Sequence, residues 1–399
     1  MEEWKEYKLG EVLTIKYGKD HKQLADGDRP IYGSGGIMRY GDRSLYDGPS
    51  ILIPRKGSLN NVIYADKPFW TVDTMFWSII NDSIANPLFV YYSICKKDFA
   101  SLNVGSAVPS LTVPVIEDID ILLPSKATQD KVISVLKSLD DKIEVNRRIN
   151  DNLEQQAQAL FKSWFVDFEP FKDRKFVNSE LGMIPEGWRV GTLNELIIST
   201  LGGDWGKEDA IGNYVKKVSC IRGADIPEIR QGNRGNMPTR FILNKNFLNK
   251  ALKAEDLVVE ISGGSPTQST GRICQISDTL LKKYDDVVIC TNFCRAIKTK
   301  RPYSQFIYYL WEYLYKRGVM FLYENGTTGI KNLDINGLLE KEIIVIPDEN
   351  TVHKYTGICN LFSQIVQSNG YESERLVRLR DTLLPKLMSG ELEINDINN

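Results

Sequence analysis

Residues 129–165, QDKVISVLKSLDDKIEVNRRINDNLEQQAQALFKSWF, decide the fold of this chain. The stretch contains neither glycine nor proline, and its apolar and asparagine residues recur at alternating spacings of four and three. Such a periodicity is typical of the contact seam of a coiled coil. The seam consists of Val132, Leu136, Leu139, Ile143, Asn146, Asn150, Leu153, Ala157, Leu160 and Trp164. The stretch therefore predicts a spacer helix about 55 Å long, at ~1.5 Å per residue.

A second seam near the C-terminus matches the first at an offset of 223 residues. Its members are Tyr355, Cys359, Phe362, Val366, Asn369, Leu376, Leu383 and Leu387. Asn146 and Asn369 occupy equivalent seam positions, where a polar residue selects register and partner at a cost in stability. Gly357 and Gly370 favour a kink or an interruption in the second helix. The alternative to a coiled coil is two surface helices, each packed on its own domain.

The globular parts of the chain are duplicated as well. Trp4, Leu9, Glu11 and Val12 are matched 184 residues later by Trp188, Leu193, Glu195 and Leu196. An apolar strand that ends in proline, at Pro124 and again at Pro347, closes each copy. The repeat predicts a first domain at 1–124, a central spacer helix at 125–170, a second domain at 171–347, and a C-terminal spacer helix with a tail at 348–399. The second domain carries about 39 extra residues in its middle.

Each predicted domain mixes strands and helices. Short β-rich runs are separated by Gly, Asn and Asp turns. They cover residues 50–54, 61–64, 76–80, 256–261 and 287–297. Tyrosine-rich helices are expected at residues 88–95 and 305–315. The predicted fold class is therefore α/β (α+β), with two similar globular domains separated by two long helices.

Composition bounds the function only loosely. Of the 399 residues, 42% are hydrophobic, and 50 Lys and Arg face 52 Asp and Glu, a net charge of -2. No apolar stretch reaches the ~18 residues needed to span a bilayer, and the charged first residues do not resemble a secretory signal. We expect a soluble, cytoplasmic protein without membrane contact. The near-zero charge argues against a nucleic-acid binder unless the charge is unevenly distributed.

The sequence offers little material for catalysis or metal binding. It has only six cysteines and two histidines, and Cys290 and Cys294 lie in an apolar run, where buried strand residues are expected rather than zinc ligands. A G-x4-GK[ST] phosphate loop and a G-x-S-x-G elbow are both absent. Residues 86–89 are similar to the Asn-Pro-Pro-Phe/Tyr box of amino-methyltransferases, but Leu88 replaces the second proline. We expect no catalytic residue, metal site or cofactor in this chain, which disfavours an autonomous methyltransferase or nuclease.

Candidate binding residues lie in polar, basic turns at matched places of the two halves. In the first half they are Tyr32, Ser34, Arg39, Arg43, Arg55, Lys56, Ser58 and Asn60. In the second half they are Arg222, Arg230, Arg234, Arg240, Ser265, Thr267, Gln268, Arg272 and Lys331. Residues 216–250 alone carry a net charge of +6. Guanidinium, ammonium, hydroxyl and amide groups suit phosphate oxygens and base edges. Any one of these stretches is also explained as a solvated loop, but their matched places favour a paired binding surface.

These features, taken in order, identify a family. The chain resembles, over essentially its full length, the specificity subunits of type I DNA restriction-modification systems. The resemblance is carried by residues 4–12 and 188–196, 32–36, 51–58, 69–74, 105–111, 259–265, 326–333 and 384–390. It implies two target-recognition domains related by a pseudo-twofold repeat. Each would read one half of a bipartite double-stranded DNA sequence, and two antiparallel helices would act as a ruler between them.

The resemblance also implies a non-catalytic subunit of a larger complex. It would dock two modification subunits, which bind S-adenosylmethionine and methylate adenine, and restriction subunits that use ATP and Mg. The predicted partner-binding positions on the helices are Leu139, Ile143, Asn146, Leu153, Leu160, Trp164, Phe362, Val366, Asn369, Leu376 and Leu383. The alternative is a coiled-coil scaffold whose globular ends bind protein without recognising DNA.

Overall fold

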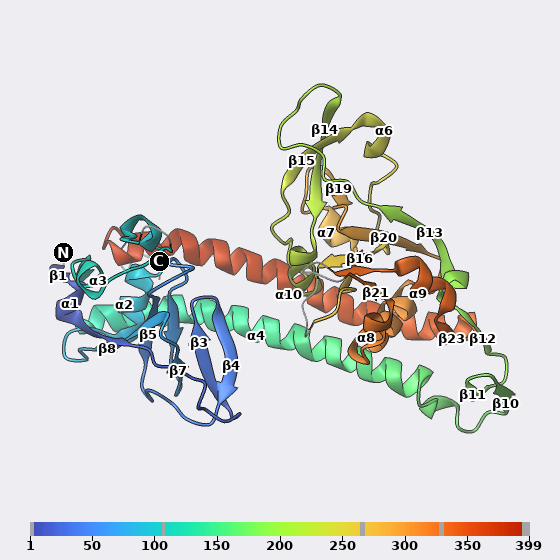
Figure 1. Cartoon of the computed structure of the whole chain (residues 1–399), viewed down its shortest axis with the longest axis horizontal. Coiled ribbons are helices and arrows are strands. Elements are labelled where there is room, and N and C mark those ends of the chain that lie inside the picture. Colours follow the sequence, from blue (N-terminus) through green and yellow to red (C-terminus); the bar gives the residue numbers. More distant parts are fainter. Residues whose placement is uncertain (1–3, 106–107, 264–267, 327–330, 393–399) are drawn as a thin grey trace. The chain divides into compact units, whose positions relative to one another are not determined.

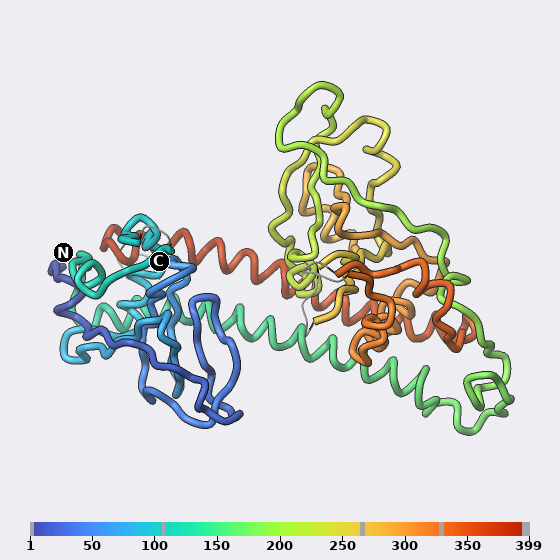
Figure 2. Tube along the Cα trace, viewed as in Figure 1, coloured from blue at the N-terminus to red at the C-terminus, as the bar shows by residue number. Residues whose placement is uncertain are grey.

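The computed structural model describes residues 4–105, 108–263, 268–326 and 331–392. The chain forms two compact units. The first contains the residues up to Asp141 together with those from Leu376 onward, and the second contains Lys142–Arg375. Figure 1 labels the elements of both units, and Figure 2 traces the chain from the blue N-terminal segment to the red C-terminal helix, whose end belongs to the first unit. Each unit therefore includes part of both long helices, unlike the predicted domains.

Two helices of 40 residues each are the longest elements, α4 (Lys126–Phe165) and α10 (Glu349–Met388). The long helix predicted over residues 129–165 is thus confirmed. Of the kink or interruption that the two glycines favoured, the interruption does not occur, because α10 is continuous through both glycines. Gly370 has a packing role instead, since an added Cβ would lie closer than 3.0 Å to the backbone of Gly232. At Gly357 an added Cβ would meet nothing within 4 Å.

The first unit is built on two small sheets and a strand pair. The larger sheet is antiparallel, in the order β2 (Leu13–Tyr17), β8 (Met75–Ile80), β5 (Ser50–Pro54) and β6 (Ile63–Ala65). The smaller has the order β4 (Gly36–Gly41), β3 (Arg29–Gly33) and β7 (Trp70–Thr71). β1 (Lys5–Lys8) pairs antiparallel with β9 (Asp120–Leu123). Buried and exposed residues alternate strictly in β9, whereas β5 is buried throughout and lies between two strands.

Short helices complete the core of the first unit. They are α1 (Leu9–Val12), α2 (Pro87–Ile94), α3 (Val113–Glu117) and the 3-10 turn Phe99–Leu102. Asn86 caps α2 by accepting a hydrogen bond from the Leu88 N–H at 2.9 Å, and a proline follows at the first helical position. Phe89 of α2 is fully buried in one cluster with Leu136 of α4 and Leu387 of α10. The first domain therefore packs on both long helices.

The second unit contains a larger set of strands. One sheet has the order β13 (Ile197–Gly202), β20 (Cys294–Thr299), β16 (Leu257–Glu260) and β18 (Ile273–Gln275), and another has β15 (Thr239–Leu243), β14 (Tyr214–Ile221) and β19 (Val287–Cys290). A third has β17 (Ser262–Gly263), β22 (Lys331–Leu333) and β21 (Glu324–Asn325). The pairs β10 (Phe176–Ser179) with β11 (Gly182–Pro185) and β12 (Arg189–Thr192) with β23 (Ile343–Ile346) are antiparallel.

Short helices pack against these sheets, and the core of the second unit includes residues of both long helices. The short helices are α5 (Ile226–Arg230), α6 (Asn244–Phe247), α7 (Asp278–Leu281), α8 (Ser304–Lys316) and α9 (Ile335–Lys341), with 3-10 turns at Glu169–Phe171, Leu193–Leu196, Gly223–Asp225 and Val319–Tyr323. Trp311 of α8 is fully buried in a cluster that includes Phe161 of α4 and Tyr355 of α10. The predicted mixture of helices and strands is thus confirmed.

The apolar run at residues 287–297 is two strands rather than one. β19 ends at Cys290 and β20 begins at Cys294, so that Thr291, Asn292 and Phe293 form the connection. Both cysteine side chains are buried, as the apolar surroundings predicted. Burial raises the pKa of the Cys294 thiol to about 12, which keeps it protonated and inert.

Candidate nucleic-acid interface

Three loops of the first unit meet beside the β3–β4 hairpin. The side-chain amide of Asn61 donates to the backbone carbonyl of Ser34 at 2.8 Å. Gly57 has a φ of 89°, and an added Cβ would lie 2.8 Å from Ser34 Oγ, so the turn after β5 approaches the hairpin turn closely. The Gly57 N–H donates to the carbonyl of Pro109 at 3.2 Å. The predicted binding residues Ser34, Arg55, Lys56 and Ser58 therefore lie together, and we call them the turn surface.

Two cations lie on the turn surface. The Lys56 side chain is exposed, and no ion pair with it is found in the part of the chain that the structure describes. The Arg55 guanidinium is held by a 3.2 Å hydrogen bond to a backbone carbonyl and lies 5.8 Å from the centroid of the Tyr17 ring. Exposed cations next to hydroxyl groups can bind phosphate oxygens. Arg43 is also exposed, but its guanidinium lies 3.7 Å from the neighbouring carboxylate of Asp42.

Two of the predicted residues support loops instead. The Arg39 guanidinium donates to the backbone carbonyls of His21 and Leu24, both at 2.8 Å, and so fixes the loop before β3. The Asn60 amide donates to the Asp98 carboxylate at 3.1 Å and accepts from a backbone N–H at 2.9 Å. These hydrogen bonds engage the guanidinium group of Arg39 and both the nitrogen and the oxygen of the Asn60 amide. Contacts from Arg39 and Asn60 to DNA stay a prediction.

Apolar residues on the hairpin were not recognised from the sequence. Ile37, Met38 and Tyr40 of β4 are 49%, 58% and 50% exposed, and Tyr17 at the end of β2 is 57% exposed. We call these four residues the hairpin patch. The register of β3 and β4 shifts at this point, since Ile31 pairs with Arg39 and Tyr32 with Ile37, so Met38 has no partner on β3. The signal in the sequence is the Ile-Met pair directly after a Gly-Gly turn. A two-stranded ribbon fits the major groove, where apolar side chains contact thymine methyl groups.

A cavity of about 730 Å³ lies at the hairpin turn. Its lining includes the ammonium group of Lys22, the hydroxyl groups of Ser34 and Thr74, and the carboxylates of Asp20 and Asp73. Backbone groups of the glycine-rich turn complete it. The cavity thus presents both donors and acceptors, which is the combination that base edges in the major groove require.

In the second unit most of the predicted cations are ion-paired. The pairs are Arg222–Asp225 at 3.0 Å, Arg230–Glu312 at 2.8 Å, Arg240–Glu208 at 2.9 Å, Arg272–Glu260 at 2.6 Å and Lys331–Glu324 at 2.9 Å. The local net charge of +6 was summed over residues 216–250 alone and so includes only the acidic residues in that range. Several of the partners lie outside that window, so the fold offsets much of the charge that the sequence suggested. DNA contacts from these five cations stay a prediction.

Fewer predicted residues of the second unit are solvent-exposed. Arg234 is exposed, and its guanidinium lies 4.6 Å from the centroid of the Tyr284 ring. Gln268 is exposed as well, whereas Ser265 and Thr267 lie outside the described residues. The Arg240 guanidinium stacks 3.8 Å from the centroid of the Trp205 ring, which is 37% exposed. Aromatic and cationic side chains therefore occur together on this unit too, a pairing that can stack on bases.

The seam residues of the long helices face their own chain. In the second unit, Asn146 of α4 donates to Glu372 at 2.8 Å, and Asn369 of α10 donates to Oδ1 of the Asn150 side chain at 2.9 Å. Asn146 is fully buried, and a helix position that buries an amide fixes the register of the pair. In the first unit the seam is continued by an ion pair of 2.6 Å between Asp140 and Arg380. The predicted partner-binding side chains are thus buried or half-buried within the chain itself.

Comparison with known proteins agrees with this geometry. Residues 1–155 match the family model of the type I restriction modification DNA specificity domain. The MjaIX specificity subunit of a type I restriction enzyme from Methanocaldococcus jannaschii is 28% identical over 369 residues, which cover 88% of this chain and 80% of the relative. The HindI specificity subunit from Haemophilus influenzae is 27% identical over 71% of both chains. The chain is thus similar, over most of its length, to specificity subunits of type I restriction enzymes.

A solved structure supports the fold of this chain. The crystal structure of a type I restriction-modification S subunit from M. genitalium aligns with a TM-score of 0.52 and covers 97% of this chain and 96% of that chain. The identity is 16%, so the likeness concerns the fold alone. In the described residues of the chain, no group of three or more His, Cys, Asp or Glu side chains could hold a metal ion. No helix among those residues is long and apolar enough to cross a bilayer.

Proposed function

We propose that this specificity subunit reads a bipartite DNA sequence, with one half read by each globular domain. The observation that carries the proposal is the turn surface, where three loops bring exposed Lys56 together with half-buried Arg55 and Ser34 next to the hairpin patch. Phosphate contacts from such cations position a duplex, and side chains on the hairpin reach base edges. The second domain would read the other half through its exposed Arg234, Gln268 and Trp205 side chains.

The two long helices are proposed to form an antiparallel coiled coil that separates the domains. Within the second unit Asn146 lies against Asn369, and Ala157 against Tyr355, so the numbering rises along one helix as it falls along the other. The strand pairs β1–β9 and β12–β23 occur at equivalent places of the two halves. Both observations support a pseudo-twofold repeat, in which the helices set the distance between half-sites.

The subunit is proposed to act without catalysis of its own. It would dock two modification subunits, which bring S-adenosylmethionine, and restriction subunits, which bring ATP and Mg. Because the seam residues already pack within the chain, partners would contact the outer helix faces, where Val145, Ile149, Leu361 and Ile365 are exposed. Exposed apolar residues at helical spacing are typical of such contacts.

A selection experiment tests DNA recognition. The complex with its modification subunits is incubated with a random duplex pool, and bound sequences are read out. We expect one split motif with a fixed spacer. Enrichment of no motif, or of a contiguous one, would contradict the proposal.

The second candidate function is a protein-binding coiled-coil scaffold, favoured by the ion pairing of the second-unit arginines. Titration with salt separates the two functions. Neutralisation of several phosphates makes the logarithm of the affinity fall by about 0.9 per phosphate for each logarithmic unit of salt. An affinity for DNA that did not respond to salt would favour the scaffold.

A further inference from the structure

Residues 230–234, which follow α5, lie between the two long helices of the second unit, and we call them the docking segment. On the α4 side, the Asn150 amide donates to the Gln231 carbonyl at 3.0 Å, and the Gln231 amide donates to the Asp151 carboxylate at 2.6 Å. On the α10 side, the backbone N–H of Arg234 donates to Glu374. The segment is thus bonded to both helices over a few residues.

A contact between two glycines defines this position. An added Cβ on Gly370 of α10 would lie closer than 3.0 Å to the carbonyl group of Gly232, and one on Gly232 would lie equally close to the carbonyl oxygen of Val366. Gly232 has a φ of 77°, which L side chains rarely adopt. Backbone therefore packs on backbone, and such a contact cannot be kept by rotating a flexible side chain.

Charged side chains hold Arg230 and Gly232 of the docking segment. Arg230 forms ion pairs with Glu312 of α8 at 2.8 Å and with Glu154 of α4 at 3.1 Å. Lys283, whose side chain is 9% exposed, donates to the Gly232 carbonyl at 2.7 Å and pairs with Glu374 at 3.0 Å. These groups join the second domain to α4 and to α10 independently.

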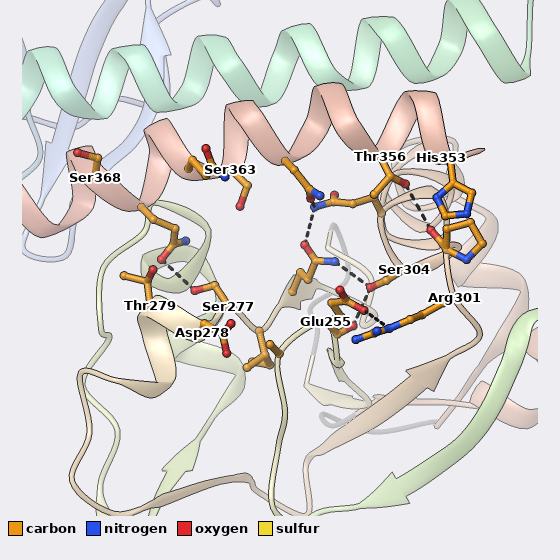
Figure 3. Close-up of a pocket in the computed structure, with 18 of the residues that line it drawn as sticks. Glu255, Ser277, Asp278, Thr279, Arg301, Ser304, His353, Thr356, Ser363 and Ser368 are labelled. Carbon is orange, nitrogen blue, oxygen red and sulfur yellow. Dashed lines mark hydrogen bonds and ion pairs between the residues drawn. The ribbon is translucent and has the colours of Figure 1, made fainter. Parts of the chain in front are cut away.

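The remaining contact with α10 is looser. A cavity of about 760 Å³ lies between this helix and the second domain, and Figure 3 shows its polar side chains from both walls. Hydrogen bonds span the cavity between Ser277 and Gln367 at 3.0 Å and between Thr356 and the carbonyl of Pro302 at 3.3 Å. Side chains can adjust such bonds. The second domain is therefore held on the helices by two close contacts, the apolar cluster around Trp311 and the backbone packing at the docking segment.

We propose that the docking segment locks the second recognition domain at one position on the helix pair and thereby sets the spacing and relative rotation of the two half-sites. This rests on the proposed reading of a split DNA sequence. A shift of docking by one residue would turn the domain by about 100° around the helix axis and move it ~1.5 Å. Because one base pair adds ~3.4 Å to a duplex, the lock discriminates between spacers. Residues 230–234 lie in the middle of the second half, where it is longer than the first.

The experiment compares Gly370→Ala with Gly357→Ala on the same helix, in the full chain assembled with its modification subunits. The readout is the ratio of affinities for a duplex with the preferred spacer and for duplexes with one base pair more or fewer. We expect Gly370→Ala to lower this ratio about tenfold and Gly357→Ala to leave it unchanged. A smaller fraction of folded protein lowers the apparent affinities for the preferred and the altered spacers equally, and so leaves their ratio unchanged.

A gentler variant covers the case that Gly370→Ala does not fold. Gln231→Ala removes only the side-chain bond to Asp151 and keeps the backbone contact with Asn150. A lowered affinity ratio in Gln231→Ala supports the proposed lock. If Gly370→Ala folds, an unchanged ratio in that variant overturns the proposal. If Gly370→Ala does not fold, an unchanged ratio in Gln231→Ala overturns it. An equal loss of the ratio in Gly357→Ala overturns it too. If the wild type enriches no split motif, the proposed function fails instead, which is a distinct result.

Discussion

Arg230→Ala tests whether this arginine supports the fold rather than contacting DNA. The variant leaves the Glu312 carboxylate, 4% exposed, without the guanidinium that lies 2.8 Å away. Removing one partner of a buried ion pair costs about 3–5 kcal/mol. We expect a loss near the lower limit, about 3 kcal/mol, because Arg230 and Glu154 each keep roughly a quarter of the side chain exposed. In complexes that still fold, the bases recognised in each half-site should not change.

Arg301→Ala is the matched control in the same unit. Its guanidinium also pairs with a carboxylate, that of Glu255 at 3.3 Å, but its side chain is 86% exposed. Exposed pairs contribute about 0–1 kcal/mol. Urea unfolding of the full chain gives the loss of stability, and hydrogen exchange at the amides of α8 shows that the second unit is the part affected.

The same variant has an expected pH dependence. Burial raises the pKa of Glu312 above its ordinary value, and Arg230 opposes this shift. Without Arg230 the pKa of the folded state rises further. A carboxyl group whose pKa is raised by folding destabilises the fold as pH rises above its unfolded value, about 4.3. The deficit of Arg230→Ala should therefore be larger at pH 8 than at pH 5. Equal losses in Arg230→Ala and Arg301→Ala, or a deficit independent of pH, would refute the reasoning.

Two further predictions concern single charges. Lys56→Gln should weaken DNA binding by the complex at every sequence and lower the slope of log affinity against log salt concentration by about 0.9. Lys131→Gln, on an exposed part of α4, should change neither quantity. Binding is measured at several salt concentrations, and equal slopes for Lys56→Gln and the wild type would exclude a phosphate contact from Lys56. Asp348→Asn should remove acid sensitivity, because hydrogen bonds from Thr351 and Trp188 outweigh burial and lower the pKa of this carboxyl. The stability that such a group contributes is present above its unfolded pKa of about 3.9 and is lost as pH falls through its folded pKa. The melting temperatures of variant and wild type should therefore converge toward pH 3. A difference in melting temperature that stayed constant with pH would contradict this prediction.

The sequence predicted the long elements well because their signals are local. The four-and-three spacing without glycine or proline was sufficient for α4, and the apolar run around Cys290 predicted its burial. The continuity of α10 was missed because Gly370 packs against Gly232, which is 138 positions away in the chain. A glycine that admits a distant backbone and a glycine that breaks a helix look the same in a sequence.

The candidate site was less predictable for the same reason. Arg272 and Lys331 lie in basic, polar turns, and only the fold brings the carboxylates of Glu260 and Glu324 to them. Ser34 and Lys56, in contrast, do meet on one surface, because the turn at Gly57 approaches Ser34 closely. The sequence gives no sign of the exposed apolar side chains of the hairpin patch other than the Ile-Met pair after the Gly-Gly turn.

Sequencing of methylated bases in host DNA tests the central claim most directly. In cells that carry this subunit with its modification subunits, the account predicts adenine methylation within one split motif whose two halves are separated by a constant number of unspecified base pairs. Changes to the first-unit turn surface should then alter one half of that motif only. A contiguous motif, or a change in both halves from substitutions in one unit, would contradict the reading of one half-site by each domain.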